Sequence, residues 1–198
     1  MKFKNILIVP IILLVFVKSF AQEKDSIQDK SWYTPDYVKM QFAGNIGFLS
    51  VGAGYQLFND VLYTELLYGF VPKSISRAEN IHLITLKNTF PLFRKKIGKE
   101  LTLIPIAGIA VTYDVGSTTF TTLPDKFPEG YYFPTAFHAT VYAGAMVHHE
   151  FKNKSLFKGA DYYLEVGTVE SYLWYAVVNE SVTFKNVFST SVGVNFYL

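Results

Sequence analysis

The chain has 198 residues, half of them hydrophobic and 17% aromatic, and its formal net charge is +2 at pH 7. The length suits one domain, and so small a charge without a clustered basic face argues against a nucleic-acid partner. Beyond residue 21, no apolar run approaches the ~20 residues that a membrane-spanning helix needs, so the sequence excludes helical spans. Cysteine is absent, which excludes disulfides and a lipoprotein anchor.

The first segment of the chain has the pattern of a cleaved signal peptide. Two lysines precede an apolar run over residues 6–17, and Ser19 and Ala21 supply small side chains where a signal peptidase reads. The run is too short for a transmembrane anchor, which is the alternative interpretation. We therefore expect residues 1–21 to be a signal peptide and residues 22–35 to be a polar periplasmic leader.

The remaining residues, 36–198, form short segments in which apolar and polar side chains alternate, as in strands with one buried face. The expected strands cover residues 38–46, 48–57, 61–71, 81–91, 101–113, 137–151, 162–175 and 182–198. An even number of antiparallel strands returns both ends of the chain to the same side of a barrel. The sequence thus predicts an all-β fold, an eight-stranded antiparallel up-and-down transmembrane β-barrel in residues 36–198.

The alternation also separates the two faces of the expected sheet. One face of the strand over residues 101–113 is apolar throughout, and the strands over 137–151 and 182–198 repeat this pattern. The opposite face is small and polar, and it holds seven glycines, Gly52, Gly54, Gly69, Gly108, Gly144, Gly167 and Gly193. Eight strands enclose so narrow a lumen that small residues must line it, so we expect this face inside and the apolar face toward lipid.

Ionisable residues fall on the expected inner face. They are Lys39, Glu65, Lys87, Glu150 and Glu165. An isolated charge in a narrow interior is costly, so these groups must pair with one another. We expect a structural network of ion pairs, and the alternative is a polar pathway that passes ions or small solutes. An open pore is disfavoured, because side chains can fill the space inside eight strands.

The last strand ends on a recognisable pattern. Ser191, Gly193, Phe196 and Leu198 stand in the order polar, glycine, aromatic and terminal hydrophobic. This ending resembles the C-terminal insertion signal of bacterial outer-membrane β-barrels, with Leu198 where phenylalanine is usual. The resemblance implies insertion by the barrel-assembly machinery into the outer membrane, among its lipids and lipopolysaccharide. The chain as a whole resembles the OmpA-like and OmpW-like group of small barrels.

Histidines are the first candidates for catalytic residues, since several small outer-membrane barrels act on lipid A or phospholipid. His138 and Thr140 share one face and resemble the His-x-Ser pair of lipid A deacylase barrels, but threonine replaces the serine nucleophile. No carboxylate follows at a spacing that would orient the imidazole. His148 and Glu150 also share a face, but two ligands do not make a metal site. We therefore expect no enzyme, no metal and no cofactor, with a lipid-modifying hydrolase or acyltransferase as the alternative.

The longest connection, residues 114–134, is the most distinctive exposed element that the sequence predicts. Three prolines restrict its backbone, and its aromatic side chains have no core to enter. These side chains are Phe127, Tyr131, Tyr132 and Phe133. The connection can be a lid over the barrel mouth or a recognition surface for a sugar, a lipid headgroup or a protein.

Taken together, these patterns favour a non-enzymatic barrel with an envelope structural or surface-binding role through extracellular loops. The sequence identifies no surface ligand. A lipid-modifying enzyme and a narrow channel for small or apolar solutes are the alternatives.

Overall fold

The computed structural model describes residues 33–116, 119–121, 136–152, 156–178 and 187–198. It separates into two units, Met1–Thr34 and Pro35–Leu198. The expected signal peptide and nearly all of the leader lie outside the described residues, as does most of the long connection. The second unit holds all the strands and helices of the described chain.

The strands follow one another along the chain with two short helices between them. They are β1 (Tyr37–Ala43), β2 (Leu49–Leu57), β3 (Leu62–Val71), β4 (Ile81–Pro91), β5 (Lys95–Lys96), β6 (Leu101–Asp114), β7 (Phe137–Glu150), β8 (Gly159–Val169) and β9 (Ser189–Tyr197), with helices α2 (Lys73–Ser76) and α3 (Glu170–Val178). Neither helix in the described residues has the length and apolar character needed to cross a membrane.

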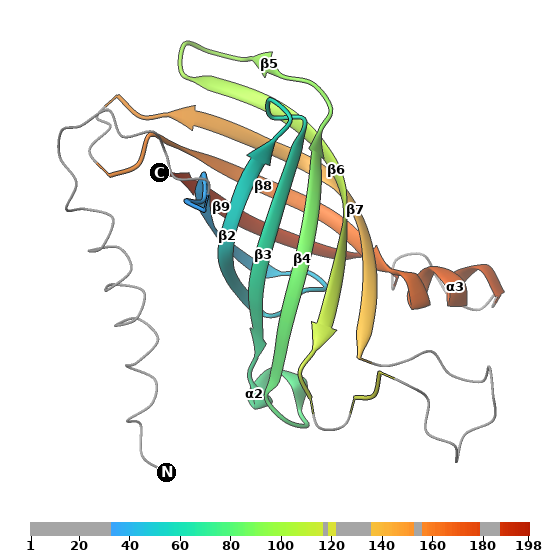
Figure 1. Cartoon of the computed structure of the whole chain (residues 1–198). Helices are drawn as coiled ribbons and strands as arrows, with labels where there is room; N and C mark the ends of the chain where they lie inside the picture. Colours follow the sequence, from blue (N-terminus) through green and yellow to red (C-terminus); the bar gives the residue numbers. More distant parts are fainter. Residues whose placement is uncertain (1–32, 117–118, 122–135, 153–155, 179–186) are drawn as a thin grey trace. The chain divides into compact units, whose positions relative to one another are not determined.

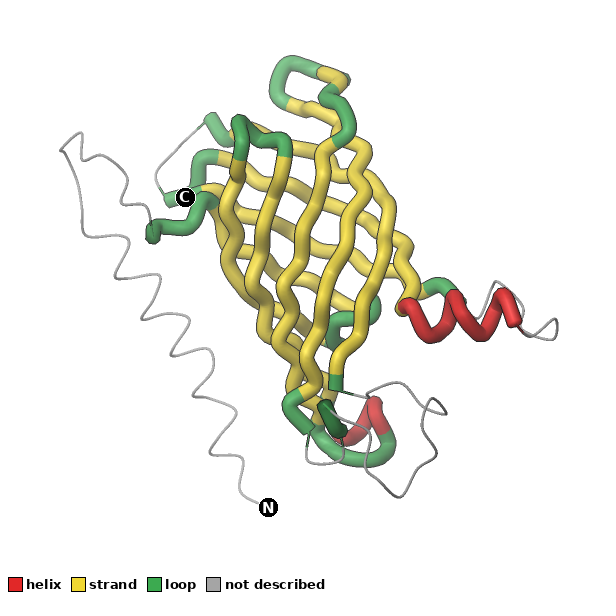
Figure 2. The backbone as a smooth tube through the Cα atoms, turned by 45° about the vertical axis from the view of Figure 1, so that its right-hand side comes forward, coloured by secondary structure: helices red, strands yellow, loops and turns green. Residues whose placement is uncertain are grey.

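The sheet closes on itself, as Figures 1 and 2 show. Neighbouring strands pair in antiparallel fashion, and β1 pairs with β9, so that Tyr37 stands opposite Tyr197. On the other side β4 pairs directly with β6, while the two residues of β5 add a short extra strand beside β6. The structure therefore confirms a closed, eight-stranded antiparallel barrel, in which no long strand leaves an unpaired edge.

Several strand boundaries differ from the expected ones. The strand expected to run to residue 46 ends at Ala43, because Ala43 and Gly44 adopt positive φ angles of 61° and 81° and turn the chain. In place of the strand expected over residues 162–175, β8 runs from Gly159 to Val169. Residues 170–175, expected to end that strand, belong to the helix α3. In the region of the strand expected over residues 182–198, the described residues begin at 187, and β9 begins at Ser189.

The two faces of the barrel differ in chemistry as the alternation predicts. Across the described long strands, no outward position holds Asp, Glu, Lys or Arg. Outward apolar side chains that are 40–61% exposed include Met40, Leu49, Leu66, Ile84, Leu86, Ile109, Val141, Leu164 and Val192. Inward positions hold the buried charges. The fold therefore reverses the arrangement of a water-soluble domain, which keeps charges outside and apolar groups inside.

Glycines line the interior because tyrosines from the next strand lie over them. The cross-strand pairs are Tyr37 with Gly54, Tyr142 with Gly108, and Tyr163 with Gly193. A methyl group added at each of these glycines would collide with the ring or hydroxyl of its tyrosine. Glycine is needed here because it leaves room for a large inward ring in a narrow barrel.

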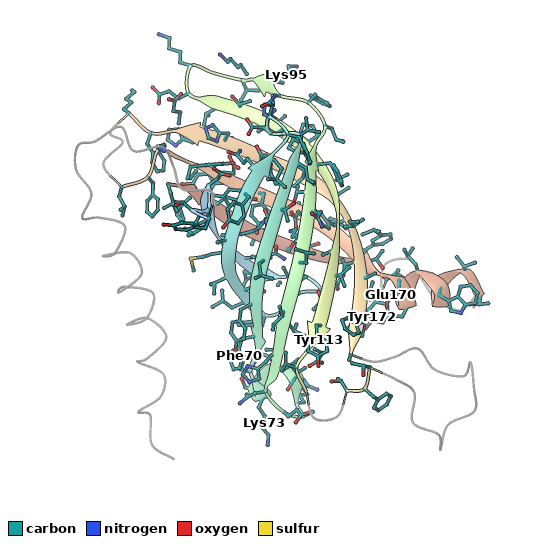
Figure 3. The ribbon with its side chains drawn as sticks, in the orientation of Figure 1. Phe70, Lys73, Lys95, Tyr113, Glu170 and Tyr172 are labelled. Carbon is teal, nitrogen blue, oxygen red and sulfur yellow. The ribbon has the colours of Figure 1, made fainter. Side chains whose placement is uncertain are left out.

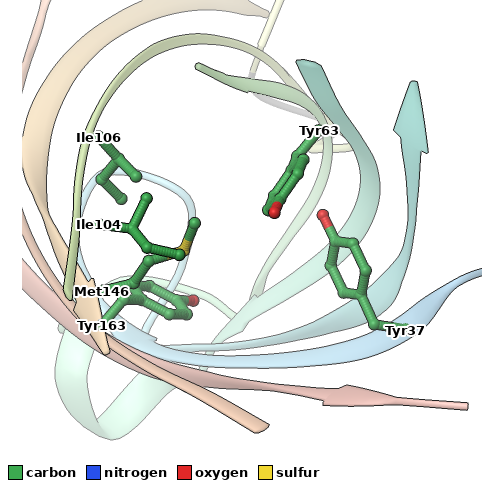
Figure 4. Close-up of a cluster of buried hydrophobic side chains, with 6 residues drawn as sticks. All are labelled: Tyr37, Tyr63, Ile104, Ile106, Met146 and Tyr163. Carbon is green, nitrogen blue, oxygen red and sulfur yellow. The ribbon is translucent and has the colours of Figure 1, made fainter. Parts of the chain in front are cut away.

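The interior is less uniformly polar than the sequence predicts. Near the start of β1 and the end of β9, buried side chains form an apolar cluster (Figure 4). Its members are Tyr37, Tyr63, Ile104, Ile106, Met146 and Tyr163. Figure 4 shows Tyr37 and Tyr63 on one side of the interior and the other four on the opposite side. Packed aromatic and aliphatic side chains fill much of this end of the lumen.

Candidate functional site

Two ion pairs occupy the middle of the barrel. Lys39 Nζ donates to both carboxylate oxygens of Glu65 at 2.8 Å, and the hydroxyl of Tyr37 donates to Glu65 Oε1 at 2.7 Å. Lys87 Nζ donates to Glu165 Oε2 at 2.6 Å. The four charged side chains are only 1–3% exposed. Four of the five expected ionisable residues are therefore brought together in the lumen, and their charges balance.

Neither ion pair joins two neighbouring strands. Glu65 and Lys87 stand opposite each other on β3 and β4, yet each makes its short ion pair with a residue of another strand. Lys39 reaches Glu65 from β1, and Glu165 reaches Lys87 from β8. The network thus ties four strands together through the centre of the barrel.

Neutral groups complete this network. Gln41 Oε1 accepts from Lys87 Nζ at 3.0 Å and from the hydroxyl of Tyr163 at 3.1 Å. Lys39 Nζ lies 4.3 Å from the ring centroid of Tyr163, and Lys87 Nζ lies 4.4 Å from that of Tyr142, both within cation–π range. Each ammonium group is therefore held by a carboxylate and an aromatic face.

Glu150 does not join the network. It lies at an inward position by register, but at the last residue of β7, where its side chain is exposed. Alternation predicts which face a residue occupies and says nothing about how far along the barrel it lies. Glu150 therefore lies at the exposed end of the barrel, apart from the buried ion pairs.

Asp161 is an interior carboxylate that the sequence analysis missed. It is fully buried, accepts from the hydroxyl of Tyr197, and lies 2.7 Å from His148 Nδ1. The expected strand began at residue 162, one residue too late to include it. Asp161 has the same parity as Glu165, so an earlier strand start would have placed it inside.

A small cavity of about 20 Å³ lies between the central ion pairs and the turn that follows β1. Its lining includes Asn45 Nδ2, Thr140 Oγ1 and Glu165 Oε1, which are buried and have no protein hydrogen-bond partner. The volume suits about one water molecule. Because water both donates and accepts, it matches this mixture of groups. The cavity thus lies beside Lys87 and Glu165, on the side of the turn that follows β1.

The candidate catalytic pair is not assembled. Thr140 Oγ1 makes no hydrogen bond, so it has no contact with a base. His138 Nδ1 instead lies 4.0 Å from Glu170 Oε1, at the junction of β8 and α3. Glu170 is the nearby carboxylate that the sequence analysis did not find, because the expected strand placed it on the outer face. A nucleophile and a base within hydrogen-bond reach are what acyl transfer requires.

Two further expectations concern metal binding and the aromatic residues of the long connection. Among the described residues, no group of three or more His, Cys, Asp or Glu side chains could hold a metal ion. The expected binding residues of the long connection, Phe127, Tyr131, Tyr132 and Phe133, lie outside the described residues.

The residues of the C-terminal pattern all lie in or beside the closing strand β9. Ser191 Oγ donates to Glu165 Oε2 at 3.3 Å, and Gly193 lies beneath Tyr163. The ring of Phe196 is 5.1 Å from that of Phe157, and the amide of Leu198 donates to the carbonyl of Asp36. Their role as an insertion signal stays a prediction.

The turns at the end where β1 begins carry exposed ion pairs. Lys152 Nζ lies 2.9 Å from Glu100 Oε1, and this contact holds the pKa of the Glu100 carboxyl below its ordinary value. Arg94 lies 3.8 Å from Asp60. Such exposed ion pairs contribute little to the stability of the folded protein.

Comparisons with protein-family models, with curated proteins and with solved structures found no match to this chain.

Proposed function

We propose that this protein is a bacterial outer-membrane β-barrel with a closed lumen and a non-enzymatic role, either structural in the envelope or in binding at the cell surface through its extracellular loops. The observation that carries the proposal is the reversed distribution of charge and apolar surface. In the part of the chain that the structure describes, the outward positions of the long strands lack Asp, Glu, Lys and Arg, whereas five acidic or basic side chains, those of Lys39, Glu65, Lys87, Asp161 and Glu165, are buried inside.

This distribution has a direct energetic meaning. In water, each exposed leucine or isoleucine on the outer wall forgoes roughly 25 cal/mol per Å² of apolar area that could be buried. Facing hydrocarbon, the same side chains are in their preferred solvent, and closure of the sheet satisfies the backbone groups that lipid cannot. A charged residue on this wall would cost about 2–4 kcal/mol at the bilayer midplane, which accounts for the absence of such residues.

The contents of the lumen support a closed barrel over a channel. A solute would have to displace two cross-lumen ion pairs and then pass the apolar cluster at the other end. The ion pairs are hydrogen-bonded, and the side chains of the cluster are packed against one another. We expect no discrete conductance in planar bilayers.

The proposed surface-binding role rests on the sequence of the long connection. Its aromatic side chains, restricted by prolines, are suited to contacts with a sugar, a lipid headgroup or a protein. Deletion of residues 125–132 should leave the barrel folded. If the connection is the recognition surface, the deletion should abolish binding of the protein to a glycan and lipid-headgroup array, and unchanged binding would remove this part of the proposal.

Export of the full chain in a Gram-negative host tests the proposed location. We expect a mature N-terminus at Gln22, recovery with the outer-membrane fraction, and extraction only by detergent. On gels without boiling, the folded barrel should migrate differently from the boiled sample. A mature chain that stays folded and monomeric in buffer without detergent would refute the proposal.

A further inference from the structure

Helix α3 is a second apolar surface outside the barrel. It begins directly after β8 and projects sideways from the wall instead of continuing along the strands (Figures 1 and 2). Glu170, its first residue, is its only charged one. Large apolar side chains along it are exposed, among them Trp174 at 56% and Val177 at 81%. A helix that is apolar around its circumference is not expected to stand free in water.

The start of the helix is fixed to the barrel. Glu170 Oε2 accepts from the backbone amide of Ala139 on β7 at 2.7 Å, and Glu170 Oε1 lies 4.0 Å from His138 Nδ1. Figure 3 shows Glu170 at the junction of barrel and helix, with Tyr172 close by. The direction in which α3 leaves the wall is therefore set by a contact, and the apolar residues that follow have a defined place.

The apolar surface of α3 continues that of the outer wall. β8 presents Leu164 and Val166 outward, both exposed, immediately before the helix begins. Exposed tyrosine and tryptophan then follow at Tyr172 and Trp174. Aromatic residues of this kind prefer the boundary between lipid headgroups and acyl chains.

We propose that α3 lies in the membrane, at the headgroup–acyl boundary on the side of the barrel opposite the start of β1, as a lateral anchor of the barrel. This inference rests on the proposed function, because it takes the outer wall to be in lipid. The occupant of the apolar helix surface is then the lipid of that membrane. The helix carries no Lys or Arg to pair with phosphate, so the contact is with the apolar part of the lipid and does not depend on lipid charge.

A tryptophan fluorescence experiment tests this placement. The chain has two tryptophans, Trp32 and Trp174, so the Trp32→Phe variant reports on α3 alone. The mature protein is refolded into phosphatidylcholine vesicles with bromine on the acyl chains either near the headgroup or near the methyl end. We expect Trp174 emission to shift to the blue relative to the urea-unfolded protein. Bromine near the headgroup should quench it more than deep bromine, and aqueous iodide should quench it weakly.

Two variants calibrate the depth. In a background without Trp32 and Trp174, Leu164→Trp places the reporter on the lipid-facing wall of β8, and Lys95→Trp places it in the exposed turn strand β5. The first should be quenched by bromolipids and the second by iodide. Emission from Trp174 that follows the Lys95→Trp pattern, in a barrel shown to be inserted by its gel mobility and protease resistance, would overturn the anchor and leave the proposed function standing.

Two further outcomes are decisive. Protection of Trp174 from iodide that disappears when the protein is diluted at constant lipid would mean that a second copy covers the helix, and the anchor would be rejected. Failure of the Leu164→Trp reporter to be quenched by any bromolipid would instead reject the membrane barrel, and with it the inference. The two failures are thus distinguishable.

Discussion

Removing one partner of a buried ion pair should reveal how much the lumen network stabilises the barrel. Lys87→Met keeps an unbranched chain of similar length against the ring of Tyr142 but removes the ammonium group. Glu165 then loses the ammonium group that lies 2.6 Å from its Oε2, while Ser191 Oγ, at 3.3 Å, continues to donate to that oxygen. Its other oxygen, Oε1, has no partner to begin with. The variant therefore leaves a buried carboxylate without a counter-charge.

The expected cost follows from this geometry. Breaking a buried pair by removing one partner costs about 3–5 kcal/mol, a hundredfold or greater fall in the folding equilibrium constant. The double variant Lys87→Met/Glu165→Gln removes both charges and should be more stable than Lys87→Met alone. The double-mutant cycle should give a coupling energy of about 2–3 kcal/mol, in the upper part of the usual range for residues in contact.

The assay is equilibrium urea unfolding of the refolded protein in vesicles, followed by circular dichroism and by the change in gel mobility. Lys96→Met, in the exposed β5, is the matched control and should leave the free energy of unfolding unchanged. If Lys87→Met costs no more than Lys96→Met, the charges are solvated, the lumen is filled with water, and the closed barrel is refuted.

Three further predictions concern the wall and the lumen. Gly108→Ala should destabilise the barrel by about 1–3 kcal/mol because the new methyl group meets Tyr142, whereas Ala143→Val on the outer face should be nearly neutral in urea unfolding. Leu66→Arg, at the centre of β3, should cost about 2–4 kcal/mol and Leu62→Arg, at its first residue, about 0–1 kcal/mol; equal costs in the same assay would argue against a bilayer around this strand. Planar-bilayer recordings of the parent protein should stay silent, and reproducible discrete steps would contradict the packed lumen.

Strand alternation places Lys39, Glu65, Lys87 and Glu165 on the inner face for a simple reason. Side chains of a strand point to opposite faces with a period of two, so Lys39 and Glu65 must face inward wherever Met40 and Leu66 face outward. The choice of partner could not be read in this way. Glu65 pairs with Lys39 of β1, on the far side of β2, instead of with Lys87 opposite it. Lys87 pairs with Glu165 of β8, because closure of the barrel through β4 and β6 brings that strand within reach.

The failures have equally local causes. The sequence does not mark Ile104, Ile106 and Met146 as interior, because their strands are apolar on both faces at these positions and the alternation signal is lost. The sequence predicts the end of a strand where helix α3 lies, since a run of apolar residues fits a lipid-facing strand as well as an apolar helix. The contact of Glu170 with the amide of Ala139, which marks the end of β8, joins residues too far apart for the pattern to show.

The most direct test that the outer face of the barrel contacts lipid is to measure how accessible nitroxide spin labels along β7 are to dissolved reagents. The chain lacks cysteine, so single labels can be placed at Ala139, Val141, Ala143 and Ala145, which share the outward face. In vesicles, we predict frequent collisions of these labels with oxygen and rare collisions with a water-soluble nickel complex, with the greatest difference in the middle of the strand. Nickel collisions as frequent as at a label on Lys95, in the exposed β5, would contradict the account.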